Sequence, residues 1–80
     1  MRDLALKIRR LRELQNYSQQ YLADQIGISQ RAYSKIEAGQ TKLSVERLDR
    51  IAKILNCPME NIISLSAEEA YFRHIYMLRR

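Results

Sequence analysis

Two short segments with helical spacing, separated by a glycine-containing turn, constrain the fold of this chain more than any other feature. Their sequences are QQYLADQ at residues 19–25 and QRAYSKIE at residues 30–37, with Gly27 between them. Ser18 and Ser29 precede the two segments, and a serine hydroxyl in that position accepts an orphan amide hydrogen of the first helical turn. Gly27 tolerates the positive φ that commonly ends a helix. The stretch therefore predicts two short helices joined by a tight turn.

Apolar residues keep a helical spacing on both sides of this stretch, and no segment alternates with period 2. We expect further helices at about 2–14, 45–55 and 58–64, and a terminal helix that Ser66-Ala67-Glu68-Glu69 opens as a capping box and that ends near residue 79. The fold class expected is all-α. The residues expected on buried faces are Leu4, Ile8, Leu11, Leu22, Ala23, Ile26, Ile28, Tyr33, Ile36, Val45, Leu48, Ile51, Ala52, Leu55, Ile62 and Ile63.

The charge of the chain favours a polyanionic partner. The 80 residues carry a net charge of +5, and residues 1–43 hold eight Lys/Arg against four Asp/Glu. Such a balance is typical of proteins that bind nucleic acid or an acidic membrane surface. No apolar run is long enough to span a membrane, and one cysteine excludes an internal disulfide. We therefore expect a cytoplasmic protein with no membrane partner.

The pair of short helices fits a helix-turn-helix motif. Ala23 is small enough for two helices to cross closely, and Gly27 follows four residues later in the turn. The outward face of the second helix carries amide, hydroxyl and cationic side chains and no acid: Gln30, Arg31, Ser34 and Lys35. Gln pairs with adenine and Arg with guanine in the major groove, whereas an acid would be repelled by phosphate. The alternative is a merely solvated helix face.

The stretch YSQQYLADQIGISQRAYSKIEAGQTKLSVERLDRIAKILNC resembles the core of the lambda-repressor-like helix-turn-helix family, which includes Cro and the xenobiotic-response-element regulators. The resemblance covers residues 4–65. It implies a five-helix domain that binds DNA as a transcriptional regulator and usually dimerises. Two departures are Tyr33, where the family usually has Ile or Val, and Leu43, where it often has Pro. Tyr33 could be wholly buried or send its hydroxyl toward DNA.

The resemblance also implies roles for individual residues. Gln30, Arg31 and Lys35 match base-reading positions, with Ser34 at base or phosphate distance. Gln19 matches a phosphate-contacting glutamine that also braces the residue at Gln30. Further contacts to the DNA backbone are implied for Ser29, Thr41 and Lys42, and a structural ion pair is implied for Arg12 and Glu37.

The C-terminal segment leaves two interpretations open. We divide the chain into a DNA-binding domain at 1–65, whose core looks complete at Leu65, and a C-terminal helix at 66–80. Five large apolar residues of that helix cover more than one of its faces: Tyr71, Phe72, Ile75, Tyr76 and Leu78. They either fold back on the core or form a dimer interface, where aromatic residues are enriched. We favour the interface.

The function expected is a sequence-specific DNA-binding transcriptional regulator, a repressor, acting as a homodimer on double-stranded DNA. The alternative is an antitoxin or another protein-interaction module on the same fold, with a toxin or other protein as partner. One histidine, His74, one cysteine, Cys57, and no suggestive carboxylate pair predict no metal site, no cofactor and no enzyme.

Overall fold

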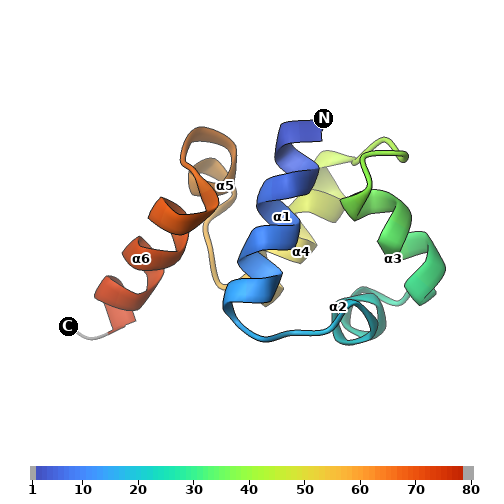
Figure 1. Ribbon diagram of the computed structural model, residues 1–80, viewed down its shortest axis with the longest axis horizontal. Coiled ribbons are helices and arrows are strands. Elements are labelled where there is room, and N and C mark those ends of the chain that lie inside the picture. Colours follow the sequence, from blue (N-terminus) through green and yellow to red (C-terminus); the bar gives the residue numbers. More distant parts are fainter. Residues whose placement is uncertain (1, 79–80) are drawn as a thin grey trace.

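The computed structural model describes the backbone of residues 2–78 and the side chains of residues 3–73. Regular structure in these residues is helical throughout, which confirms the all-α fold and the added C-terminal helix. The helices are α1 (Arg2–Leu14), α2 (Gln19–Ile26), α3 (Gln30–Glu37), α4 (Val45–Leu55), α5 (Met59–Ser64) and α6 (Ala67–Leu78). In Figure 1, α1 runs through the middle, with α2 and α3 on its right, α5 and α6 on its left, and α4 behind it.

Local capping explains where the middle helices begin and end. The side chains of Ser18, Ser29 and Ser44 accept backbone N–H groups in the first turns of α2, α3 and α4. Each such cap contributes about 1 kcal/mol to stability. Gly27 and Asn56 end α2 and α4 in the left-handed conformation, with φ of 73° and 57°. The observed bounds therefore agree with the expected ones to within a residue or two.

The core lies where α1 meets the other helices. Fully buried residues from α1, α2, α4 and α5 form its centre: Ile8, Leu11, Leu22, Ile51, Leu55 and Ile62. The stripe predicted from helical spacing is thus largely correct. Two members are wrong, because Val45 is 70% exposed and Ile63 is 56% exposed. Each lies at or near an end of its helix, where apolar spacing continues but no neighbouring helix covers the side chain.

The start of α6 belongs to the same core. Ala67 and Ala70 are buried, and α6 packs against α1. The expected capping box is present: the N–H of Ser66 donates to Glu69 Oε1 at 3.4 Å, and the N–H of Glu69 donates to Ser66 Oγ at 3.2 Å. The expectation that the core is complete at Leu65 is therefore wrong. Small alanine side chains, which carry little sequence signal, let α6 approach the domain closely.

Candidate nucleic-acid interface

The turn between α2 and α3 is a Schellman motif. Gly27 N–H donates to Asp24 O at 3.3 Å, and Ile28 N–H donates to Ala23 O at 3.0 Å. These are the two hydrogen bonds that close a helix on a left-handed residue. A Cβ on Gly27 would meet no atom within 4 Å, so its φ of 73° rather than crowding is what favours glycine here. The turn fixes the direction in which α3 leaves α2.

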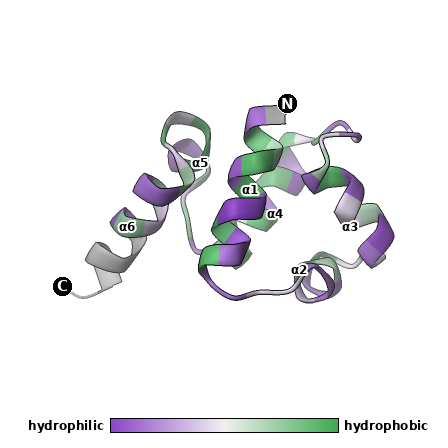
Figure 2. Ribbon diagram, viewed as in Figure 1, coloured by the Kyte–Doolittle hydropathy of each residue, from purple (hydrophilic) through white to green (hydrophobic). Residues whose placement is uncertain are grey.

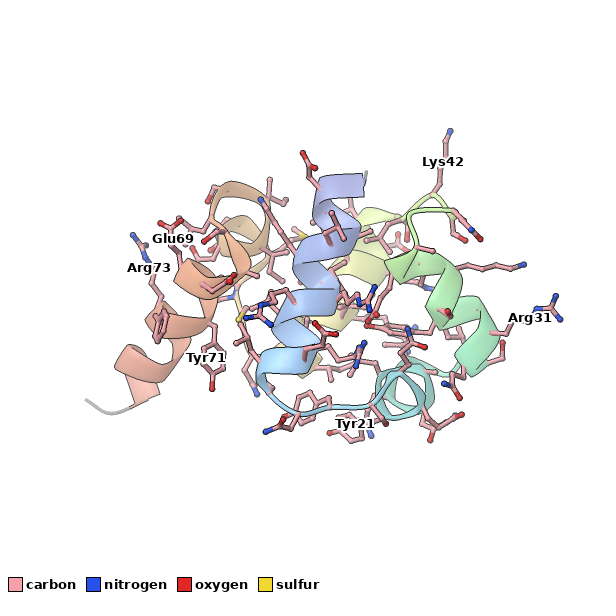
Figure 3. The ribbon with its side chains drawn as sticks, in the orientation of Figure 1. Tyr21, Arg31, Lys42, Glu69, Tyr71 and Arg73 are labelled. Carbon is pink, nitrogen blue, oxygen red and sulfur yellow. The ribbon has the colours of Figure 1, made fainter. Side chains whose placement is uncertain are left out.

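The outward face of α3 is polar and cationic, as expected. Gln30, Arg31 and Lys35 are exposed, and Ser34 is half-buried. The acid of this helix, Glu37, is buried on the opposite side. Arg31 extends away from the body of the molecule in Figure 3, and Figure 2 shows hydrophilic residues at the same end of α3. The structure therefore brings the candidate base-reading residues together on one accessible surface.

The predicted backbone-contact residues flank that surface. Ser29 caps α3, its hydroxyl accepting the N–H of Ala32 at 3.1 Å, so it marks the first turn of the helix. Thr41 and Lys42 are exposed in the α3–α4 loop. Lys42 extends from the tip of this loop into solvent (Figure 3). The N-terminus of α3 and the loop after its C-terminus thus frame the helix at both ends.

Apolar residues fix the inner face of α3. Tyr33 and Ile36 are buried in the core, and they anchor the side of α3 opposite to its exposed polar face. The question that the sequence left open at Tyr33 is answered, since its side chain is 0% exposed. Its hydroxyl cannot reach DNA in this conformation.

A buried ion pair joins α3 to α1 and α2. Arg12 donates from Nε to Glu37 Oε2 at 2.7 Å and from Nη2 to Glu37 Oε1 at 3.0 Å. Arg12 also donates from Nη1 to the carbonyl of Tyr17 at 2.8 Å, in the turn before α2. Only 12% of the Arg12 side chain and 2% of the Glu37 side chain are exposed. The pair implied for these two residues is therefore present, in a bidentate and largely desolvated form.

The protonation states of this cluster follow from its contacts. Hydrogen bonding to Glu37 raises the pKa of Arg12 above its ordinary value. Burial alone would raise the pKa of Glu37, but the hydrogen bonds from Arg12 and Gln19 and the neighbouring Tyr33 hydroxyl lower it overall. Both groups are therefore charged near neutral pH, and the charge pair holds α3 in place.

Gln19 differs from its expected arrangement. Its Nε2 donates to Glu37 Oε1 at 3.1 Å, so the side chain turns toward the ion pair instead of bracing Gln30. The reason is electrostatic, because a buried carboxylate is a stronger acceptor than a solvated amide. Gln19 is still the first residue of α2 and remains half-buried at the edge of the domain.

Three cations of α1 have partners inside the domain, and two of these partners are distant in the sequence. Lys7 donates from Nζ to the carbonyl of Ile63 at 2.9 Å, and Arg10 lies 3.4 Å from Glu68 in α6. Arg9 pairs with Glu13 one turn later in α1. Local spacing identifies that last pair, but the other two join residues more than fifty positions apart. Arg31, Lys35 and Lys42 form no ion pair among the residues described.

The proposed interface residues of α6 fall into two groups. Tyr71 is half-buried and packs against the core, whereas Phe72 is 65% exposed. Their rings meet edge to face with centroids 6.0 Å apart. The side chains of Ile75, Tyr76 and Leu78 lie outside the described residues. Tyr71 therefore favours packing of α6 on the core, whereas Phe72 favours an interface with another molecule.

The described residues form no group of three or more His, Cys, Asp or Glu side chains that could hold a metal ion. Cys57 is a buried free thiol beside α6, and burial raises its pKa. An open groove at the junction of α4 and α5 borders this region and is lined by Asp49, Lys53, Asn56 and Met59 among others. None of the described helices has the length and apolarity needed to cross a membrane.

The fold and the exposed face of α3 define the chain as a helix-turn-helix domain of the DNA-binding type. A family model described as helix-turn-helix matches residues 8–62. Because the match covers more than half of the sequence, the chain belongs to this family, and the lambda-repressor-like resemblance is confirmed. No curated protein and no solved structure gives a significant match. The family supports a DNA-binding regulator, to which the geometry above adds the candidate contact residues.

Proposed function

We propose that the protein is a sequence-specific transcriptional repressor that reads the major groove of double-stranded DNA with α3. The observation that carries the proposal is the accessible face of α3, where Gln30, Arg31 and Lys35 stand together without an acid. A recognition helix presents such side chains to base edges from its first turns. The cytoplasmic location expected from the sequence is consistent with DNA as the partner.

The roles of the contact residues follow from their positions. Gln30 and Arg31 occupy the first turn of α3 and would contact adenine and guanine edges, respectively. Ser34 and Lys35 lie a turn further along, at base or phosphate distance. The remaining contacts would be to the DNA backbone and would position the helix without reading sequence; they come from Gln19, Ser29, Thr41 and Lys42.

Selection of bound duplexes from a random pool tests this proposal, followed by affinity measurements over a range of salt concentrations. We expect a preferred sequence and a strong loss of affinity with salt, because each neutralised phosphate contributes about −0.9 to the log–log slope. Enrichment of no sequence, together with a slope near zero, would contradict the proposal. Repression is then tested by placing the selected site in a reporter promoter.

We further propose that the protein acts as a homodimer through the outer face of α6. Phe72 supports this, since a side chain of this size at 65% exposure is unfavourable on a monomer. A two-fold pair would place two copies of α3 in adjacent major grooves, about 34 Å apart.

Sedimentation of the full-length protein tests the dimer. Removing residues 66–80 would also remove Ala67 and Ala70 from the core, so a point substitution is the sharper variant. We expect Phe72→Ser to produce a folded monomer, whereas Leu6→Ser, at another exposed apolar residue, leaves the dimer intact. A wild-type protein that sediments as a monomer at high concentration would contradict this part of the proposal.

A further inference from the structure

The outer face of α6 carries two opposite charges beside its exposed aromatic residue. Glu69, Phe72 and Arg73 are all exposed, and helical spacing places them on one side of α6. Tyr71 points toward α1 in Figure 3, whereas Arg73 extends from the side of α6 that faces away from α1. This face therefore holds one acid, one large apolar ring and one base, and none of them is buried in the core.

Neither charge of this face forms an ion pair within the described part of the chain. The adjacent acid, Glu68, does have a partner, since it lies 3.4 Å from Arg10 of α1. Glu69 and Arg73 are four residues apart, yet the described ion pairs include neither of them. One oxygen of Glu69 accepts the Ser66 N–H in the capping box, and the other has no described partner. Both groups are therefore available to an opposite charge from outside the chain.

The arrangement of these two charges is self-complementary. In a two-fold symmetric interface, a residue i that contacts residue j of the partner requires j to contact i in return. When two copies of α6 lie antiparallel, Glu69 faces the partner's Arg73, and the same contact is made twice. When they lie parallel, like charges face each other. The charges thus favour the antiparallel arrangement and match a second copy of this chain, whereas an acidic or a basic partner would match only one of them.

The antiparallel arrangement also covers the exposed ring. The two-fold axis between the paired charges passes midway between residues 69 and 73, and Phe72 lies one residue, about 1.5 Å along the helix, from that midpoint. The Phe72 side chains of the two copies therefore meet near the axis, where each is removed from water. An apolar aromatic centre with charges at its edge is typical of protein interfaces.

We propose that two copies of α6 pair antiparallel, with Glu69 of each copy bound to the partner's Arg73 across a central pair of Phe72 rings. The inference rests on the proposed homodimer and adds Glu69 and Arg73 as the residues that set the direction of pairing. An interface through Phe72 alone leaves that direction open, because an apolar contact is non-directional. The direction matters for DNA binding, since it fixes how the two copies of α3 are oriented.

Charge reversal in the full-length protein tests the pairing, with sedimentation velocity at several protein concentrations as the readout. Arg73→Glu should weaken dimerisation about tenfold, because it replaces attraction by repulsion at two symmetry-related contacts. Glu69→Arg should weaken it similarly, and the two changes combined should restore it to within about twofold, since opposite charges again face each other. Arg50→Glu, which makes the same change of net charge at an exposed residue of α4, is the matched control and should leave dimerisation unchanged.

A mixture of the wild type and the double variant tests the direction of pairing. With antiparallel helices a mixed dimer places like charges together, so we expect the two proteins to remain as separate homodimers. Energy transfer between fluorescently labelled samples measures how far they mix. Parallel helices would instead favour mixed dimers, and preferential or random mixing would overturn the inference.

Salt separates an electrostatic loss from damage to the helix. The loss of dimerisation in each single variant should shrink at about 1 M salt, where exposed charges are screened. A loss that persists unchanged at high salt, or wild-type dimers that tolerate both single reversals, would overturn the inference and leave the homodimer itself standing. A wild-type protein that is monomeric at every concentration would refute the proposed homodimer together with this inference, while recognition of DNA by α3 is tested independently by selection.

Discussion

The basic residues of α1 and those around α3 have the same charges but different surroundings. In α1, Lys7, Arg9 and Arg10 each contact an acid or a carbonyl of the protein itself. Around α3, three exposed cations project into solvent without an ion pair among the described residues: Arg31, Lys35 and Lys42. The excess of positive charge in residues 1–43 is therefore divided between cations with partners inside the domain and cations exposed to solvent. Lys7 and Arg10 join α1 to α5 and α6, and Arg9 pairs within α1, whereas the cations around α3 are the ones proposed to contact DNA.

This difference shows that the number of basic residues in a segment does not by itself identify a nucleic-acid-binding surface. A cation with an internal partner has less to gain from a phosphate, because binding would break the existing contact. Arg12 is the extreme case, since it is almost fully withdrawn into the ion pair with Glu37. We accordingly expect substitutions in α1 to change stability and substitutions around α3 to change DNA affinity.

The largest loss of stability is expected when the buried ion pair between Arg12 and Glu37 is broken. Arg12→Ala leaves the Glu37 carboxylate buried and unpaired, which should lower the free energy of unfolding by about 3–5 kcal/mol. Urea denaturation followed by circular dichroism measures it. Arg9→Ala is the matched control on the same helix, because its partner Glu13 is exposed and the pair contributes little. Equal stability of the two variants would show that the buried pair does not hold α3.

A substitution on the exposed face of α3 should have a smaller effect, which changes DNA affinity and leaves stability unchanged. Arg31→Ala should weaken binding to the preferred duplex by about 1–3 kcal/mol and relax preference at one base pair of each half-site. Its unfolding curve should match the wild type, since the side chain is exposed. Competition between the preferred duplex and single-base variants measures the relaxation. A uniform loss across all duplexes would make Arg31 a phosphate contact instead.

Acid should weaken the buried pair. The pKa of Glu37 in the folded protein lies below its ordinary value of 4.5, so its charge stabilises the fold above that pH. This contribution is lost as pH falls from about 4.5 through the lowered pKa, where folded Glu37 takes up its proton. Glu37→Gln should therefore be less stable than wild type at neutral pH, and the difference should shrink in acid. A constant difference across the pH range, measured by denaturation, would contradict the ionic role.

The smallest effect is expected in the α3–α4 loop. Lys42→Ala should weaken binding to all duplexes by a similar factor and reduce the log–log salt slope by about one, because it removes a single phosphate contact. Arg10→Ala, which breaks an exposed internal pair with Glu68, should leave the slope unchanged. A reduced slope in the Arg10 variant would remove the distinction between the two sets of cations.

The helices and the face of α3 could be predicted from sequence because their signals are local. Serine caps, Gly27, Asn56 and the 3.6-residue spacing all act within a few positions of the chain. The exposure of Ile63 could not be predicted, since it depends on which helix ends remain uncovered. The partners of Lys7 and Arg10 are also invisible in sequence, because packing of α1 against α5 and α6 creates them.

The most direct test of the central distinction is to map which backbone amides respond to DNA. A titration of the isotopically labelled protein with the selected duplex, followed by NMR, reports on α1 and α3 in one experiment. We predict the largest shifts at residues 29–35 and 41–42 and at Gln19, with the amides near Lys7, Arg9 and Arg10 little changed. Shifts concentrated in α1, with α3 unaffected, would contradict the account.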